Sequence, residues 1–315
     1  MSILAIDLGG TKLAVALFST LGELRSKEVI SLDKRTGTWV GELITGQVKK
    51  YITSEGSSLQ SIGVSVPGIS RRKTGTVWAP NIAGWEDYPL MREIKQVAGA
   101  VPVSIDSDRA CCILGEQWQG NARGCQDAIF LSVGTGIGAG ILVDGHILHG
   151  SHDIGGSVGW MALHKPFQEK YIACGCFEYY ASGEGIAKRT REILTTRPEY
   201  RGTLNNLSPE QITAHHVFSA FEDKDPVAVK VMGDCIEFWG MAVANLISIF
   251  NPEKIIFGGG VFGPAIKWIT LIKEEATKWA QPISAKLVSF EPSGLRGDAA
   301  IYGAGFLALK NIQSI

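Results

Sequence analysis

Two glycine-rich turns are the residues most suited to chemistry, and the chemistry they suit is the binding of a polyphosphate. Each turn joins two apolar segments, and the two read Asp7-Leu8-Gly9-Gly10-Thr11-Lys12 and Gly134-Thr135-Gly136-Ile137-Gly138. Glycine lets the backbone approach a bound group closely and leaves N–H groups free to face an anion. One such turn is a weak signal, because glycine-rich hairpins also occur in proteins that bind no phosphate. The repetition predicts a duplicated clamp around a polyphosphate.

The first turn also carries side chains that suit a magnesium–phosphate complex. Asp7 ends a strand, where its carboxylate can hold hydrated Mg²⁺. Gly9, Gly10 and Thr11 can present N–H and hydroxyl groups to phosphate, and Lys12 adds positive charge. The alternative is that Asp7 only caps a tight turn, but a carboxylate at a buried strand end needs a partner. We expect Gly134, Thr135 and Gly136 to bind the other side of the phosphates.

Phosphoryl transfer also needs a base near the attacking hydroxyl, and Asp106-Ser107-Asp108 offers two candidates. This stretch follows an apolar strand predicted at residues 101–106 and precedes a helix predicted at residues 108–118. Asp108 is our candidate base, because a carboxylate at a helix N-terminus can project into a cleft. Asp106 competes with it, since side chains alternate in direction along an extended chain. A capping role alone is the alternative for Asp108, although Ser107 can also fill that role.

The elements that must position these residues form a repeated α/β pattern. In the first third, periodicity predicts strands at residues 3–7, 13–18, 62–66 and 101–106 and helices at 39–52 and 90–97. After the second turn, a helix at 226–250 precedes a strand at 254–257, and further helices are predicted at 263–279 and 299–309. Gly258 and Gly259 follow that strand, where adenine and ribose could lie against bare backbone. A loose helix start is the alternative for these glycines.

Composition narrows the class of protein. The 315 residues carry a formal charge of −1 with no basic run, so we expect small-molecule partners and no nucleic acid. The longest apolar run, residues 240–250, is too short to span a bilayer, and the first residues have no cationic region. Neither membrane insertion nor export is indicated. Six cysteines are too few for a disulfide scaffold of this length, which predicts a cytoplasmic protein.

Together the motifs resemble the ROK proteins, a family of the actin-like ATPase superfamily composed mostly of bacterial sugar kinases. The resemblance spans nearly the whole chain. Besides the two turns, its markers are Val66-Pro67-Gly68, Pro80-Asn81, Asp108 with Gly115-Glu116, Gly175-Cys176-Phe177-Glu178, and Asn251-Pro252 followed by Gly258-Gly259-Gly260. The implied fold is α/β, with two actin-like (ribonuclease H-like) lobes and a cleft between them. The N-terminal lobe is expected at residues 1–114, completed by a C-terminal helix at 299–315, and the C-terminal lobe at 115–298.

The resemblance also implies an activity: ATP-dependent phosphorylation of a hexose, glucokinase-like, at O6. Its cofactors would be ATP and Mg²⁺, and lobe closure would exclude water. Counting back from Gly115-Glu116, the family's catalytic aspartate falls on Asp108. Gly68, Asn81 and Glu178 keep the positions of residues that bind the sugar. Family members are commonly dimers or tetramers, so a homodimer or higher homo-oligomer is expected.

Several residues on the acceptor side depart from the family pattern. The family's usual Asn before the catalytic aspartate is Ser107 here, and Gly-Glu-x-Gly-His becomes Gly156-Ser157-Val158-Gly159-Trp160. The sugar contacts must therefore be rearranged around Ser107, Ser157 and Trp160. The indole of Trp160 offers an apolar face for stacking on C–H groups of a sugar ring, and filling of core space is the alternative.

A structural zinc site, frequent in this family, is not expected. Counting back from Cys176 places Tyr171 and Glu169 where two cysteine ligands belong, and Trp160 occupies the histidine position. Tetrahedral zinc needs four donors at defined distances, and Cys174 and His164 do not complete the set.

Two other functions remain open from the sequence. The first is a non-catalytic sugar sensor or pseudokinase, since other ROK proteins are transcriptional repressors. Those proteins place a helix-turn-helix segment before the first hairpin, whereas that hairpin begins at residue 3 here, so a repressor is not expected. Retention of Asp7, Asp108 and both turns also favours a working phosphate site. The second is a kinase that acts on an amino sugar, a ketose or a cyclitol.

Overall fold

The computed structural model describes residues 1–313, and their contacts divide the chain into two compact units. Unit 1 comprises residues 1–124 and 147–155 together with the segment that begins at Ser293. Unit 2 comprises residues 125–146 and 156–292. The boundary predicted between residues 114 and 115 falls inside helix α3 (Asp108–Gln119), which unit 1 contains whole. Residues 314–315 of the predicted C-terminal helix lie outside the described residues.

Unit 1 is built on a five-stranded sheet in the order β3-β2-β1-β4-β7. β1 pairs antiparallel with β2 and parallel with β4, which in turn pairs parallel with β7. The carboxyl ends of β1, β4 and β7 therefore lie at one edge of the sheet, where the first glycine turn joins β1 to β2. The strands are β1 (Ser2–Leu8), β2 (Lys12–Ser19), β3 (Leu24–Ser31), β4 (Leu59–Val66) and β7 (Val103–Ser107).

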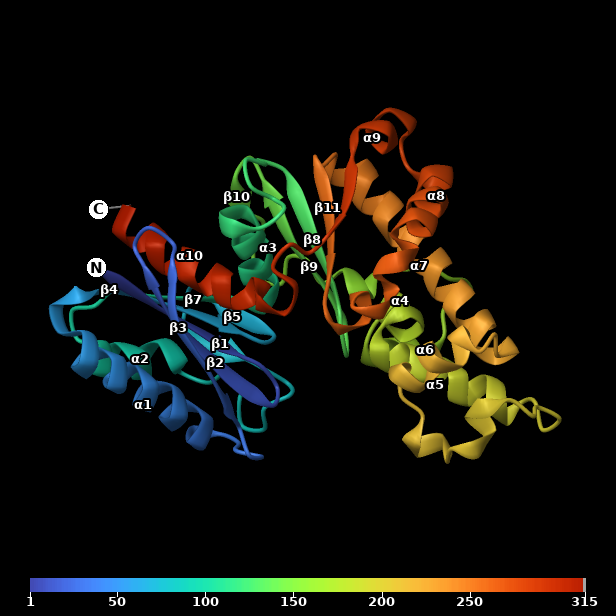
Figure 1. Ribbon diagram of the computed structural model, residues 1–315, viewed down its shortest axis with the longest axis horizontal. Coiled ribbons are helices and arrows are strands. Elements are labelled where there is room, and N and C mark those ends of the chain that lie inside the picture. Colours follow the sequence, from blue (N-terminus) through green and yellow to red (C-terminus); the bar gives the residue numbers. More distant parts are fainter. Residues whose placement is uncertain (314–315) are drawn as a thin grey trace. The chain divides into compact units, whose positions relative to one another are not determined.

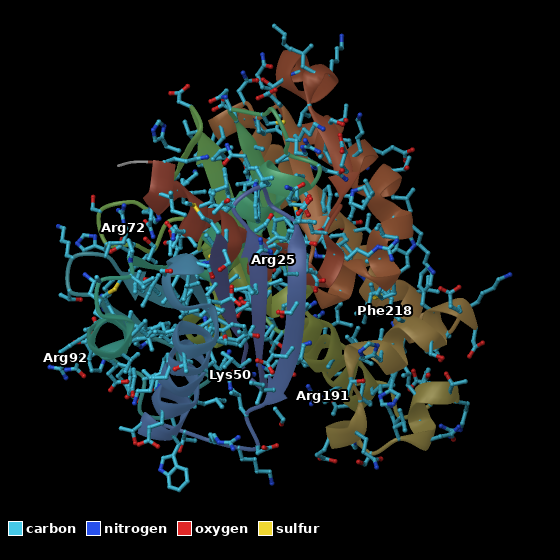
Figure 2. All side chains as sticks on the ribbon, turned by 60° about the vertical axis from the view of Figure 1, so that its left-hand side comes forward. Arg25, Lys50, Arg72, Arg92, Arg191 and Phe218 are labelled. Carbon is cyan, nitrogen blue, oxygen red and sulfur yellow. The ribbon has the colours of Figure 1, made fainter. Side chains whose placement is uncertain are left out.

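Helices cover both faces of this sheet because its central strands are apolar on both sides. Along β1, Leu4, Ile6 and Leu8 pack in one core with α1 (Thr38–Glu55) and α2 (Leu90–Ala98). Ile3 and Ala5 point to the other face and pack with α10 (Ala299–Gln313), which also contacts α3 (Figure 1). Lys50 of α1 and Arg92 of α2, both labelled in Figure 2, lie on the exposed sides of their helices.

Unit 2 repeats this plan with a second five-stranded sheet in the order β10-β9-β8-β11-β12. β8 pairs antiparallel with β9 and parallel with β11, as β1 does with β2 and β4. The repeat of the hairpin predicted from the sequence is thus a repeat of sheet topology. The strands are β8 (Ala128–Val133), β9 (Ile137–Val143), β10 (His146–Ile147), β11 (Lys254–Gly258) and β12 (Ser289–Pro292).

Helices make up most of the remainder of unit 2. They are α4 (Cys176–Ala181), α5 (Gly183–Thr195), α6 (Ala214–Glu222), α7 (Pro226–Phe250), α8 (Ile269–Trp279) and α9 (Pro282–Leu287). α7 passes through the core of the unit, where Trp239 is fully buried and its indole N–H donates to the Ala181 carbonyl at 3.0 Å. Figure 2 labels Phe218 of α6, whose ring stacks on Trp268 with centroids 5.5 Å apart.

Several sequence predictions about elements were incomplete. Strand β3 was not predicted, and neither were the short strands β5 (Ile69–Arg71) and β6 (Thr76–Trp78). The helix predicted at 263–279 is divided, because a 3-10 helix at Pro264–Trp268 precedes α8. The other 3-10 helices are Gly56–Ser58, Val158–Trp160, Glu169–Ala173, Thr203–Asn206, Pro209–Gln211, Gly260–Phe262 and Arg296–Asp298.

Two properties of residues 1–313 bear on the class of protein. Within residues 1–313, no helix has the length and apolar character needed to cross a bilayer. All six cysteines are free thiols, and Cys111, Cys125, Cys176 and Cys235 are buried. Buried thiols of this kind behave as small apolar side chains.

Candidate functional site

Asp7 lies near the carboxyl end of β1, beside the neighbouring strand β4. The Ser65 hydroxyl donates to its Oδ1 at 2.7 Å. Burial raises the pKa of Asp7 from 3.8 to about 6, and the hydrogen bond from Ser65 opposes that shift. The carboxylate is thus a hard oxygen donor whose charge is only partly compensated, which fits a hydrated divalent cation.

The turn that follows Asp7 is open to solvent at its tip. The Gly9 N–H donates to the Lys12 carbonyl at 2.9 Å, which closes the turn, and Gly10, Thr11 and Lys12 are exposed. The structure therefore leaves Gly10, Thr11 and Lys12 accessible at the edge of the sheet, whereas the N–H that was expected to make Gly9 a phosphate donor is bonded within the turn.

Two further sequence-predicted residues of unit 1 lie close to this edge. A Cβ added at Gly10 would lie 4.0 Å from the Cβ of Asn81, so the first turn and the Asn81 loop are neighbours. Gly68 has a φ of +83°, and a Cβ there would lie 2.2 Å from the Trp78 carbonyl oxygen, so only glycine fits. The Gly68 carbonyl accepts a hydrogen bond of 3.2 Å from Arg109 Nη2, next to Asp108.

Asp108 is the first residue of α3, at the carboxyl end of β7. Its Oδ1 accepts from the Arg109 N–H at 2.8 Å. Burial raises the pKa of Asp108, while the Arg109 charge and this backbone hydrogen bond oppose the shift. The charge of Asp108 in turn raises the pKa of Asp7. The two predicted carboxylates are thus within electrostatic reach of each other, and a raised pKa suits a general base.

Ser107 and Asp106 have other partners. Ser107 is the N-cap of α3, and its hydroxyl accepts from the Ala110 N–H at 3.3 Å. The capping role is therefore filled by Ser107 and does not fall to Asp108. Asp106 is buried, with Oδ1 accepting from the Ser107 N–H at 2.7 Å and Oδ2 lying 2.8 Å from His149 Nε2. Of the two competing aspartates, Asp108 is the less engaged by side chains.

His149 was not predicted from the sequence. It belongs to residues 147–155, a segment that packs with unit 1 although it follows β9 in the chain. An ion pair also fixes the segment, because Arg72 Nε lies 2.6 Å from Asp153 Oδ1 and the Arg72 backbone N–H donates to Asp153 Oδ2 at 3.1 Å. Arg72 is labelled in Figure 2. Neither pair has a local spacing that could have revealed it, since the partners are more than forty residues apart.

The second glycine turn, between β8 and β9, is held against α4 and α5. The Gly134 carbonyl accepts from the Gly183 N–H at 2.8 Å, while the Gly134 N–H donates to the Gly136 carbonyl at 2.9 Å. The Glu178 carboxylate accepts from the Ile137 N–H at 2.6 Å. Burial raises the pKa of Glu178, although this hydrogen bond opposes the shift. A Cβ at Gly136 would lie 2.7 Å from Glu178 Oε2, so a larger residue there would displace the carboxylate. Thr135 is exposed at the tip of the turn.

The altered acceptor motif lies beside Glu178 in unit 2. A Cβ at Gly159 would lie 3.0 Å from the Cβ of Glu178, and one at Gly175 would lie 2.6 Å from the Trp160 Cα. Ser157 precedes the 3-10 helix that ends at Trp160. Trp160 is 57% exposed, so its alternative interpretation as a core-filling residue is wrong.

Gly258 and Gly259 have a packing role of their own. Gly258 is buried, and a Cβ there would lie 2.2 Å from the Phe130 ring. Gly259 has a φ of +87°, and a Cβ would lie 2.4 Å from the Val133 carbonyl oxygen. Both glycines let β11 and the following turn approach β8. The 3-10 helix that follows agrees with the predicted alternative of a helix start, and nucleotide binding by these residues stays a prediction.

The positions that would carry zinc ligands hold other side chains. Tyr171 is buried, and its hydroxyl lies 2.7 Å from the Tyr180 hydroxyl. Glu169 and Trp160 are exposed, while Cys176 is buried. Over the described part of the chain, no group of three or more His, Cys, Asp or Glu side chains could hold a metal ion. The absence of zinc stays a prediction, and Asp7 fits Mg²⁺ through water.

Comparison with known proteins gives this geometry a context. A family model described as ROK family matches residues 3–311. The chain is 32% identical to a glucokinase of Halalkalibacterium halodurans, over 98% of this chain and 96% of that protein. It is 33% identical to a xylose repressor of Caldicellulosiruptor bescii, over 82% of this chain and 65% of that protein. A solved ROK family glucokinase from Streptomyces griseus, in complex with glucose and AMPPNP, matches with a TM-score of 0.76 and 26% identity, covering 98% of this chain and 100% of that one. The predicted α/β fold of the actin-like class is thereby confirmed.

Proposed function

The chain belongs to the ROK family, and from that premise we propose that it is an ATP-dependent kinase that phosphorylates a hexose, glucokinase-like, at O6. The observation that carries the proposal is the pair of carboxylates at one sheet edge of unit 1. Asp7 and Asp108 both have raised pKa values, and the charge of Asp108 contributes to the raised pKa of Asp7. Such a pair suits a site that binds a cation and also removes a proton.

Asp108 would act as the general base. Its raised pKa makes it a better proton acceptor than an exposed aspartate, and Arg109 holds one carboxylate oxygen by its backbone N–H. As the sugar hydroxyl oxygen attacks the γ-phosphorus of ATP, Asp108 takes the hydroxyl proton. The bond from the γ-phosphorus to the bridging oxygen breaks, and ADP leaves with that oxygen.

The nucleotide would be bound by both glycine turns. Gly10 and Thr11 would donate to phosphate from unit 1, with Lys12 adding positive charge, while Gly9 would keep the turn closed through its bond to the Lys12 carbonyl. Thr135 and Gly136 would donate from unit 2, where Gly134 would keep its turn closed through its bond to the Gly136 carbonyl, and Gly258 with Gly259 would border adenosine. Asp7 would hold Mg²⁺ through water, and the ion when bound neutralises phosphate charge. The similar glucokinase solved with AMPPNP supports ATP as the donor.

The sugar would be bound by residues that the sequence pattern singles out on both units. Asn81 and Glu178 supply amide and carboxylate groups for sugar hydroxyls, and the exposed indole of Trp160 supplies a stacking surface. The remaining candidates are Gly68, Ser107 and Ser157. Because the Ser107 hydroxyl already caps α3, its share in sugar binding would be made with its free donor hydrogen.

A non-catalytic sugar sensor is the second candidate function. The match to a xylose repressor, at 33% identity over 82% of this chain, favours it, because that protein is named for regulation and not for catalysis. Retained carboxylates at Asp7 and Asp108 favour the kinase. An amino sugar, a ketose or a cyclitol as acceptor would keep the kinase mechanism and change only the sugar contacts.

The test is a coupled ADP-release assay with Mg·ATP and a panel of hexoses, N-acetylhexosamines and ketoses. We expect sugar-dependent turnover that disappears in Asp108→Ala and persists in the control Asp87→Ala, an exposed aspartate of unit 1. Absence of turnover with every acceptor, while ATP and a sugar both bind, would overturn the kinase and support the sensor.

A further inference from the structure

A pocket of about 380 Å³ in unit 1 is not used by the proposed mechanism. It lies in the connection between β3 and α1, and its volume falls in the usual range for small-ligand pockets, about 300–1,000 Å³. Its lining residues are Asp33, Lys34, Arg35, Thr36 and Trp39.

Backbone hydrogen bonds place this pocket between two parts of the candidate site. At its start, the Leu32 N–H donates to the carbonyl of Thr11 in the first glycine turn at 2.9 Å. At its end, the Gly37 N–H donates at 2.8 Å to the carbonyl of Ala83, in the loop that carries Asn81. A ligand seated at Asn81 could therefore extend into the pocket.

Trp39 gives the pocket an exposed aromatic surface. Its side chain is 67% exposed, whereas Trp85 in the neighbouring loop is 1% exposed and packs in the core. Trp39 stands in the first turn of α1, so a regular helix fixes its backbone. A tryptophan ring left open to water beside a cavity suits stacking against the C–H face of a sugar ring.

Asp33 and Arg35 add polar groups that are already held in place. Arg35 Nη1 donates to Asp33 Oδ2 at 3.1 Å and to the carbonyls of Ser31 and Leu32, both at 3.2 Å. Hydrogen bonds from Ser31 and Arg35 lower the pKa of Asp33, so its carboxylate stays an acceptor at neutral pH. A guanidinium and a carboxylate side by side offer donors and acceptors to adjacent hydroxyls.

We propose that this pocket is a subsite for a second sugar ring, which makes disaccharides and glycosides part of the substrate class. The proposal rests on the proposed function in one respect, since the first ring would occupy the acceptor site beside Asn81. An anion is the competing occupant, because Lys34 and Arg35 are cations and the N-cap Gly37 has no capping side chain. The neutral ring is favoured because Asp33 lies in the same pocket and pairs with Arg35, and because Trp39 offers an apolar face.

The test is calorimetric titration of the whole protein, without ATP, with glucose, cellobiose, maltose and inorganic phosphate. Trp39→Ala is expected to weaken binding of at least one disaccharide about tenfold, the scale of one aromatic contact, and to leave glucose within about twofold. Trp39→Phe should recover most of the loss. Trp279→Ala, which removes a 65% exposed indole from unit 2, is the matched control and should change neither affinity.

Three results would overturn the subsite. The first is that Trp39→Ala leaves the affinity for both disaccharides unchanged. The second is that Trp39→Ala weakens the binding of glucose and of both disaccharides equally. The third is that the protein binds phosphate, that Lys34→Ala abolishes this binding, and that disaccharides do not compete with it. Failure of the two proposals can be told apart. If the protein phosphorylates hexoses but disaccharide binding does not depend on Trp39, the kinase proposal stands and the subsite proposal fails. If disaccharide binding depends on Trp39 but no sugar is phosphorylated, the subsite proposal stands and the kinase proposal fails.

Discussion

The two sheets share one topology but differ in charge at the turn after their first strand. In unit 1, Asp7 lies opposite Ser65 of the neighbouring parallel strand, and the two side chains are hydrogen-bonded. In unit 2, the corresponding pair is Ser132 opposite Gly258, which provides no carboxylate. The two units therefore share the same arrangement of strands, but the carboxylates of the candidate chemistry are concentrated in unit 1.

Unit 2 uses its own carboxylate differently. Glu178 accepts a hydrogen bond from the N–H of Ile137 and thereby ties α4 to the second turn. Burial raises the pKa of all three carboxyl groups, but Asp108 and Asp7 form a pair at one sheet edge, whereas Glu178 is bonded to the second glycine turn. Unit 1 is thus suited to hold a cation and remove a proton, while unit 2 is suited to present backbone donors and sugar contacts.

The largest expected effect is that of substituting Asp108, which tests whether the catalytic carboxylate lies in unit 1. Asp108→Asn should reduce kcat about 10²–10⁴-fold, the usual contribution of general acid–base catalysis. The fold should be retained, because burial disfavours the charge that the substitution removes. Steady-state kinetics and thermal unfolding measure the two properties. A variant with near-normal kcat would show that the base lies elsewhere.

Asp7→Asn tests the raised pKa through stability. The pKa of Asp7 is about 6 in the folded state against 3.8 in an exposed side chain, so the folded state binds the proton more tightly than the unfolded state. The stabilisation that results is complete below pH 3.8 and is lost as pH rises through 6. The variant should therefore exceed the wild type in free energy of unfolding by up to about 3 kcal/mol above pH 6, and match it near pH 4.

Denaturant unfolding from pH 4 to 8 measures this difference, and Ser132→Ala, at the corresponding position of unit 2, is the control. The control should shift stability equally at every pH because Ser132 does not titrate in this range. A pH-independent difference for Asp7→Asn would contradict the raised pKa.

Substitution of two adjacent glycines tests how closely the turn after β11 approaches β8 in unit 2. Gly259→Ala places a Cβ 2.4 Å from the Val133 carbonyl oxygen at a φ of +87°, and should destabilise the protein by about 2–3 kcal/mol. Gly260→Ala meets open space within 4 Å and should change the free energy of unfolding by less than about 0.5 kcal/mol. Equal effects in thermal or denaturant unfolding would refute the close approach.

The smallest effect concerns Tyr171, which occupies the position of one of the absent zinc ligands. Tyr171→Phe removes the hydroxyl that contacts Tyr180 and should cost about 1 kcal/mol of unfolding free energy. Treatment with a chelator should leave the wild-type Tm unchanged. One zinc per chain, measured by metal analysis after chelation, would contradict the prediction.

The sequence predicted those parts of the fold whose signals are local. Both glycine turns, the position of Asp108 at the start of a helix and the long helix α7 follow from glycine patterns and apolar periodicity. Strand β3 lacked such a signal because most of its residues are exposed and it carries the charged residues Arg25, Lys27 and Glu28, as is common on an edge strand. Helix 263–279 was predicted as continuous although Pro264 begins a separate 3-10 segment.

Contacts between distant parts of the chain could not be predicted. The His149–Asp106 pair joins residues 43 positions apart, and no spacing rule relates them. The pocket at Trp39 depends on backbone hydrogen bonds to the Thr11 and Ala83 carbonyls, which only tertiary folding brings together. The exposure of Trp160 likewise required the structure, because aromatic residues are more often buried.

The most direct test of the central claim follows the phosphate itself. ATP labelled at the γ-phosphate is incubated with a hexose and either the wild type or Asp108→Asn, and the products are separated. We predict label in the hexose 6-phosphate for the wild type and none above background for the variant. Label only in inorganic phosphate, or equal transfer by both proteins, would contradict a sugar kinase with Asp108 as its base.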